Sequence, residues 1–153
     1  MRGYASMAFG CPFEGTTDPA RVDDAVAAMI GAGADAIILA DTIGIGEPAQ
    51  VRSLGGAALE HVPAARLGLH MHDTHGRAAA NCAVGVEMGM ELMDAAVGGC
   101  GGCPFAPGSA GNLATEDLLG VLDQAGVPHG VEPSALLAAN RELGTALGRT
   151  LVQ

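Results

Sequence analysis

Lysine is absent from this 153-residue sequence, in which all seven basic residues are arginine. The absence excludes Schiff-base chemistry, which needs a lysine amine, and a P-loop, whose phosphates need a lysine partner. Seventeen acidic residues outnumber the basic ones and give a formal net charge of −10 and a pI near 4.6. Because a nucleic-acid partner would need a basic cluster, we expect none.

The sequence also lacks long apolar runs and has few cysteines. Residues 1–9 are interrupted by Gly10 and Pro12 too soon to form the apolar core of a signal peptide. No apolar run is long enough to cross a bilayer. The four cysteines are too few for a secreted disulfide scaffold. We therefore expect no membrane association and a cytoplasmic location.

Short apolar segments alternate with longer helical ones along the chain. The apolar content of 49% and the length suffice for one domain, residues 1–153, with a real core. Asp18 before Pro19 and Thr115 before two acidic residues are predicted helix N-caps. Strand ends recur about every 30 residues, the size of one strand-plus-helix unit. The pattern predicts strands at residues 4–9, 36–40, 67–71 and 92–97, and helices at 19–31, 49–60, 77–88, 115–126 and 133–149.

Four such units fit either a doubly wound sheet or part of a (β/α)₈ barrel. Polar residues follow the strand ends; a barrel gathers such residues on one face, whereas an open sheet spreads them along an edge. No Gly-x-Gly-x-x-Gly motif opens a helix, which weakens the dinucleotide-binding alternative. We therefore expect an α/β fold, a partial TIM barrel of four βα units plus a C-terminal helix. The polar residues are Cys11, Asp41, His70, His72, Cys103 and Asn112.

The segment His70-Met71-His72 offers two imidazoles at the end of a predicted strand. Residues two apart in a strand share a face, so both rings can point at one centre. Two imidazoles with oxygen ligands suit a divalent ion, and an oxygen-rich complement favours magnesium or manganese over zinc. The alternative interpretation is two polar residues at the rim of a sheet.

A glycine-rich loop over residues 98–112 holds Cys100 and Cys103 in a C-x-x-C spacing. Glycines let a loop approach a ligand closely or move, so one hypothesis is a thiol that acts beside the substrate. A redox pair or a zinc site is weaker, because no second C-x-x-C is present. Loop cysteines without a role are the remaining alternative.

Three further residues are candidates for the site, and two of them, Glu116 and Asp41, carry two interpretations each. Asn112 offers an amide oxygen to a metal ion. Glu116 either caps the helix that follows it or faces the site, and Asp41, at a strand end, is either a turn cap or a carboxylate of the site.

Several segments together resemble 3-hydroxy-3-methylglutaryl-CoA lyases, in the order and near the spacing of that family, from about residue 2 to residue 131. A His-x-His motif is shared with a wider group of metal-dependent barrel lyases and condensing acyltransferases, but the Gly-Gly-Cys-Pro loop is particular to the lyases. The segments are Gly10-Cys11-Pro12-Phe13-Glu14-Gly15, Asp41-Thr42-Ile43-Gly44, His70-Met71-His72-Asp73-Thr74, Gly101-Gly102-Cys103-Pro104 and Gly111-Asn112-Leu113-Ala114-Thr115-Glu116-Asp117.

The resemblance implies that His70, His72 and Asn112 bind Mg²⁺ or Mn²⁺, that Cys103 is the active-site thiol, and that Asp41 is a further polar residue of the site. The implied reaction cleaves an acyl-CoA substrate, hydroxymethylglutaryl-CoA, to acetyl-CoA and acetoacetate. Since a Schiff base is impossible here, a metal acting as a Lewis acid is the route left for the cleavage. His70 could also move protons, because imidazole titrates near neutral pH.

The resemblance covers only the C-terminal half of the family, so the arginine–aspartate pair of the first barrel strand has no counterpart. Open strand edges are sticky, and we expect the chain to associate with itself or with a separate N-terminal half. Two function classes follow: a metal-dependent lyase completed by such a partner, or a catalytically incomplete fragment or binding module. A related acyl-CoA condensing enzyme is a third possibility, against which the Gly-Gly-Cys-Pro loop argues.

Overall fold

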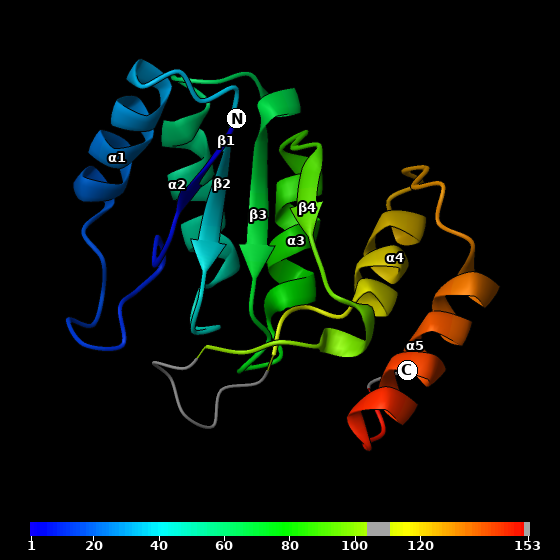
Figure 1. Cartoon of the computed structure of the whole chain (residues 1–153). Coiled ribbons are helices and arrows are strands. Elements are labelled where there is room, and N and C mark those ends of the chain that lie inside the picture. Colours follow the sequence, from blue (N-terminus) through cyan, green and yellow to red (C-terminus); the bar gives the residue numbers. More distant parts are fainter. Residues whose placement is uncertain (104–110, 152–153) are drawn as a thin grey trace.

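The computed structural model describes residues 1–103 and 111–151. Its sheet has four parallel strands, and each pairs with the next strand along the chain. A helix follows each strand, as the sequence predicts (Figure 1). The strands are β1 (Arg2–Ala5), β2 (Ala36–Asp41), β3 (Leu67–Met71) and β4 (Leu92–Asp94). The helices are α1 (Pro19–Gly31), α2 (Pro48–Ala58), α3 (Ala78–Glu87), α4 (Thr115–Gln124) and α5 (Pro133–Leu147), with short 3₁₀ turns η1 (Ala64–Arg66) and η2 (Val97–Gly99).

The two faces of the sheet have different surroundings, because side chains alternate along each strand. One face packs against the helices α1, α2 and α3, and its fully buried side chains include Ile37, Leu39 and Leu69. All six residues of β2 are buried, as expected of a strand covered on both sides. The opposite face carries the polar side chains of Tyr4, His70 and Asp94.

Helix α1 begins as predicted, with Asp18 accepting a hydrogen bond from the backbone N–H of Ala20 and Pro19 in the first turn. The predicted cap at Thr115 is wrong. Helix α4 starts at Thr115 itself, after Ala114, which makes no side-chain cap. The acidic residue that follows Thr115 is engaged elsewhere, as described below.

Two predicted strands are too long. The first ends at Ala5 rather than at residue 9, because its pairing with β2 stops there and Met7 turns the chain with a φ of 58°. The fourth ends at Asp94 rather than at residue 97. Beyond Asp94 the backbone of Ala96 pairs with Ala114, on the segment that returns from the glycine-rich loop.

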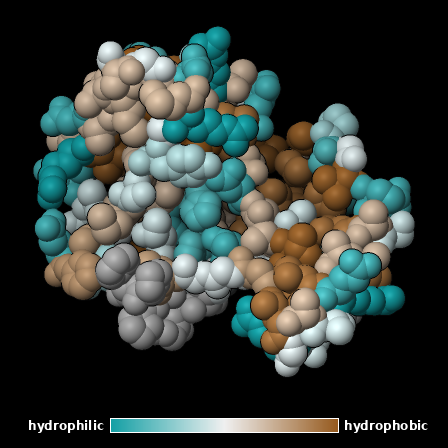
Figure 2. All heavy atoms as spheres, viewed as in Figure 1, coloured by the Kyte–Doolittle hydropathy of each residue, from teal (hydrophilic) through white to brown (hydrophobic). Residues whose placement is uncertain are grey.

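Helix α4 lies beside α3, and α5 lies beyond it (Figure 1). Apolar side chains gather over α4 and around the hollow that separates it from the strands (Figure 2). This hollow is a groove of about 730 Å³, next to the edge of β4 that no described strand covers. Its apolar lining includes Met90, Met93, Leu118, Leu119 and Leu122. None of the helices in the described part of the chain is long and apolar enough to span a membrane.

Candidate metal and thiol site

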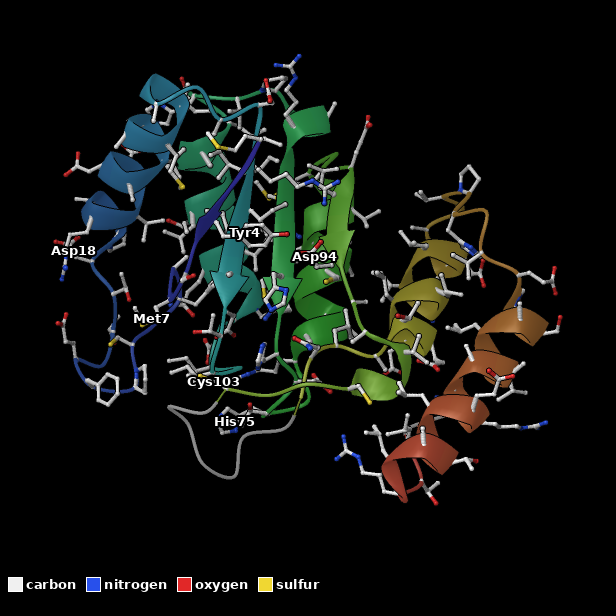
Figure 3. All side chains as sticks on the ribbon, in the orientation of Figure 1. Tyr4, Met7, Asp18, His75, Asp94 and Cys103 are labelled. Carbon is white, nitrogen blue, oxygen red and sulfur yellow. The ribbon has the colours of Figure 1, made fainter. Side chains whose placement is uncertain are left out.

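The candidate site lies at the carboxyl ends of the strands. His70 is the fourth residue of β3, and His72 follows one residue after that strand ends. Their ring centroids are 5.3 Å apart. Figure 3 shows Cys103 and His75 at this same end of the sheet. The strand geometry therefore brings the two imidazoles together, as their spacing indicates.

His72 is held from two sides by the backbone. Its N–H donates to the carbonyl of Asp41 at 3.1 Å, and it forms an isolated β-bridge with Asn112. Only 5% of the residue is exposed, and its ring Nδ1 is buried without a hydrogen-bond partner in the described part of the chain. Burial and the neighbouring His70 lower the pKa of His72, against an opposing effect of the Asp41 carboxylate. A neutral ring with an unused lone pair is the form that binds a metal ion.

His70 faces a carboxylate on the next strand. Its Nδ1 lies 3.6 Å from Oδ2 of Asp94, and the same oxygen accepts a hydrogen bond from the hydroxyl of Tyr4 at 2.8 Å. Figure 3 shows Tyr4 and Asp94 pointing toward one another across the sheet. A carboxylate beside one ring nitrogen favours the tautomer that leaves the other nitrogen free for a metal ion. Sequence reasoning missed both partners, and the predicted strand ran on to residue 97, so it did not place Asp94 at a strand end.

Asn112 is oriented by a backbone carbonyl. Its side-chain Nδ2 donates to the carbonyl of Cys100 at 2.8 Å, so the amide nitrogen is already used and the oxygen is the group left for a ligand. Its segment is fixed where Leu113 donates its backbone N–H to the carbonyl of Met71. Two imidazoles and one amide oxygen at one edge fit a divalent cation as a partial ligand set. The described residues contain no group of three or more histidine, cysteine and acidic side chains arranged for a metal ion.

Asp41 serves the turn that follows β2. The residue is 1% exposed; its Oδ1 accepts from the backbone N–H groups of Gly44 and Ile45 and its Oδ2 from that of Gly46, at 2.6–3.2 Å. Both carboxylate oxygens are therefore engaged, in the turn-cap arrangement that was one of its two interpretations. The catalytic interpretation stays a prediction.

Cys103 lines a cavity of about 320 Å³ that also reaches His72. The hydroxyl-bearing residues Ser6 and Thr42 line the same cavity, and both directly follow the end of a strand. For Thr42 this position was a signal in the sequence, whereas Ser6 falls inside the strand predicted at residues 4–9. Residues 104–110 of the glycine-rich loop, including the proline of the Gly-Gly-Cys-Pro motif, lie outside the described residues.

Comparison with known proteins finds one family model and several curated lyases that match this chain. Residues 2–142 match the model of a family described as HMGL-like. The mitochondrial hydroxymethylglutaryl-CoA lyase of Pongo abelii is 43% identical over 149 residues, which cover 97% of this chain and 46% of that protein. The cytoplasmic 3-hydroxy-3-methylglutaryl-CoA lyase of Mus musculus is 39% identical over 150 residues, covering 98% and 44%.

Solved structures agree with the sequence relatives. An HMG-CoA lyase from Acinetobacter baumannii, in complex with coenzyme A and 3-methylmalate, matches 99% of this chain and 50% of its own with a TM-score of 0.93 and 38% identity. The hydroxymethylglutaryl-CoA lyase of Pseudomonas aeruginosa has the same TM-score and identity over 99% and 51%. The partial TIM barrel is thereby confirmed. The chain spans about half the length of the relatives it matches.

Proposed function

This chain belongs to the HMGL-like family, and we propose that it provides the metal- and thiol-bearing half of a lyase that cleaves 3-hydroxy-3-methylglutaryl-CoA to acetyl-CoA and acetoacetate. One observation supports this most: His70, His72 and Asn112 converge at the same edge of the sheet as the cavity that Cys103 lines. The relatives bear the names of enzymes with this activity.

The lyases of this family generally depend on a divalent metal ion. In this chain His70, His72 and Asn112 would hold it, and magnesium or manganese suits a site completed by oxygen ligands. When bound, the ion would supply Lewis-acid stabilisation of negative charge on the substrate oxygens. The lowered pKa of His72 keeps its ring neutral and available at neutral pH.

The protein's own groups would move the protons. In an alternative role of His70, with the ion held by His72 and Asn112, the ring nitrogen that does not face Asp94 accepts the proton of the tertiary hydroxyl group. The hydroxyl oxygen becomes the ketone of acetoacetate as the neighbouring carbon–carbon bond breaks. The electron pair of that bond passes to the acetyl-CoA enolate, and the thiol of Cys103 gives its proton to the enolate carbon. The proton on His70 then restores the Cys103 thiol. The cavity beside Cys103 and His72 would shield this exchange from water.

The unpaired edges of the sheet indicate that the partner is the other half of a barrel. Among the described residues, β1 and β4 each pair on one side only, and unpaired strand edges bind further strands. We propose that a second polypeptide segment, or a second copy of this chain, closes the barrel there. A stable monomer in sedimentation at micromolar concentration would count against the association.

All four cysteines are free thiols, which suits a reducing compartment, and we propose the cytoplasm.

The test is acetoacetate release from hydroxymethylglutaryl-CoA with Mg²⁺ or Mn²⁺ present. The chain is assayed alone and mixed with the N-terminal portion of a full-length relative. Turnover that needs both pieces, and that Cys103→Ala and His72→Ala each abolish, supports the proposal. No release from either sample, or release that Cys103→Ala leaves intact, contradicts it.

A binding module without turnover is the second candidate. It is favoured by the partial ligand set, since no group of three or more histidine, cysteine and acidic side chains suited to a metal lies within the described residues. This candidate predicts that the chain binds Mn²⁺ and an acyl-CoA in equilibrium measurements, yet releases no acetoacetate with any complement. Turnover in the mixed sample would exclude it.

A further inference from the structure

Glu116 lies in the first turn of α4, and its carboxylate is engaged away from the candidate metal ligands. It accepts the backbone N–H of Gly98, at 2.9 Å on Oε2 and 3.3 Å on Oε1. Oε1 also accepts from Nδ2 of Asn140, on α5, at 2.7 Å. Glu116 thus neither caps its helix nor faces the site. It joins the glycine-rich segment to the C-terminal helix.

The backbone at Gly98 is built for this contact. Gly98 has a φ of 56°, a conformation that favours glycine. A Cβ added there would lie 2.5 Å from Cβ of Leu151 and 2.9 Å from Nδ2 of Asn140. Asn140 is 2% exposed, deep in the contact between α5 and η2. The close approach of α5 therefore depends on glycine at residue 98 and on an amide at residue 140.

From Gly98 the chain leads directly to the thiol. The backbone N–H of Cys100 donates to the carbonyl of Val97 at 3.2 Å, and the carbonyl of Cys100 accepts from the side chain of Asn112 at 2.8 Å. Three residues later Cys103 lines the cavity with His72. Residues 98–103, here called the cysteine stem, are thus fixed at one end by Glu116 and Asn140 and near the middle by Asn112.

We propose that Glu116 and Asn140 are positioning residues, which act through the cysteine stem to hold the Cys103 thiol at the cavity beside His72. The proposal rests on the proposed function only for why that placement matters. Its geometry is independent of turnover. The carboxylate of Glu116 binds two donors at once, and hydrogen bonds to a charged group are the stronger kind. Without these hydrogen bonds, the Glu116 carboxylate would no longer link the cysteine stem to α5.

The four cysteines make the placement measurable without an activity assay. Cys82 is fully buried in α3, and burial raises its pKa to about 12, so iodoacetamide reaches it only when the chain unfolds. Cys11 lies after β1, far along the chain from the stem, and serves as the reference thiol. Mass spectrometry of the peptides gives the alkylation rate of each cysteine in one sample.

Two single variants test the contact. Asn140→Asp places a second carboxylate beside that of Glu116, and Glu116→Gln replaces the charged acceptor of the Gly98 and Asn140 hydrogen bonds by a neutral amide. Glu142→Gln, at an exposed residue of the same helix, is the matched control. The double variant Glu116→Gln with Asn140→Asp exchanges the amide and the carboxylate and keeps one donor and one acceptor at the contact.

We expect both single variants to alkylate Cys103 about tenfold faster relative to Cys11, since a charge-assisted hydrogen bond changes an equilibrium by roughly that factor or more. Cys82 should stay protected from alkylation, and the control Glu142→Gln should alkylate Cys103 at the wild-type rate. In the double variant, which exchanges the amide and the carboxylate, the Cys103 rate should fall back toward the wild-type rate. In the complemented lyase the single variants should lower kcat more than they raise KM.

Three results would overturn the proposal: an unchanged Cys103 rate in the folded single variants, an equal rise at Cys11 and Cys103 with Cys82 still protected, or an exchanged pair as reactive as the single variants. If Asn140→Asp exposes Cys82, the chain has unfolded and Glu116→Gln decides by the same criteria. Failure of the lyase assay with selective Cys103 exposure intact would reject the proposed function and leave the positioning role standing.

Discussion

Tyr4 on β1 donates its hydroxyl to Asp94 on β4 at 2.8 Å, which joins the first and last strands of the sheet. Three strand spacings of about 4.8 Å would separate these strands by about 14 Å in a flat sheet. Two side chains that stand upright on the same face of a flat sheet would not meet over that distance. The sheet is therefore curved around this face, as in a barrel wall. His70 lies on β3, one of the two strands between β1 and β4.

The first prediction concerns the ionisation of Tyr4. The hydrogen bond to Asp94, then burial, then the charge of Asp94 raise the pKa of this phenol above 10.0. In Asp94→Asn the pKa should fall toward 10.0. Since the sequence has one tyrosine and no tryptophan, phenolate absorbance reports Tyr4 alone. A raised pKa stabilises the fold below pH 10, and the contribution is lost as the pH rises through the folded-state pKa.

Arg2 supplies a control of opposite sign. Its guanidinium lies 3.9 Å from Asp94 and lowers the pKa of Tyr4. Arg2→Gln should therefore raise the pKa, while Asp94→Asn lowers it. An unchanged titration curve in Asp94→Asn would show that Tyr4 and Asp94 do not meet in solution, and would remove the argument for curvature.

The second prediction separates the two interpretations of Asp41. Asp41→Asn keeps one acceptor oxygen, which serves either the N–H groups of Gly44 and Ile45 or that of Gly46, and sets an amide nitrogen, which cannot accept, against the other. We expect the free energy of unfolding in urea to fall by about 1–3 kcal/mol, the cost of unpaired buried donors. Asp24→Asn, on the exposed side of α1, should change it little. An unchanged unfolding free energy with lost turnover would instead favour the catalytic interpretation.

Local pattern was sufficient for the central strands. The apolar run of β2 and the alternation of β3 each identify a strand, and the alternation alone places His70 and His72 together. Their burial follows from period and length, which are properties of contiguous residues. The same holds for the start of α1, where Asp18 and Pro19 are adjacent signals.

Contacts between distant residues were beyond such reasoning. Glu116 had two local interpretations, and the structure shows a third because Asn140, 24 residues later, reaches its carboxylate. Tyr4 meets Asp94, 90 residues later, only because the sheet curves. The apolar pattern also ran past Ala5, where the pairing of β1 stops although β2 continues to Asp41. Pairing and curvature are properties of the folded chain, and no window of sequence contains them.

The third prediction compares two glycines. Gly44 has a φ of 71°, and a Cβ there would lie 2.6 Å from the backbone nitrogen of Thr74. Gly44→Ala should cost about 2–5 kcal/mol of unfolding free energy, from the left-handed conformation and the overlap. Gly56 lies within α2, and a Cβ added there would meet open space, so Gly56→Ala should add about 0.5–1 kcal/mol. Equal effects in urea unfolding would contradict the turn geometry that places Thr42.

The fourth prediction concerns metal binding by the chain itself, measured as Mn²⁺ affinity by calorimetry. His72→Ala and Asn112→Ala should each weaken binding by at least about tenfold, the range found even for residues that only support a ligand. His75→Ala is the matched control, because His75 is exposed at the same edge of the sheet. If all three variants bind as wild type does, or weaken binding equally, the ions occupy other groups and the ligand assignment is wrong.

The pH dependence of this affinity gives the fourth prediction its sharper form. A proton and a metal ion compete for the ring of His72, whose pKa is lowered from 6.5 by burial and by His70. In His70→Ala one cause of that lowering is gone, and the Asp41 carboxylate, which acts in the opposite direction, remains. The pKa of His72 should therefore rise toward 6.5, and residual Mn²⁺ binding should begin to weaken at a higher pH than in wild type. A fall in affinity that begins at the same pH in both proteins would show that the two imidazoles do not share one site.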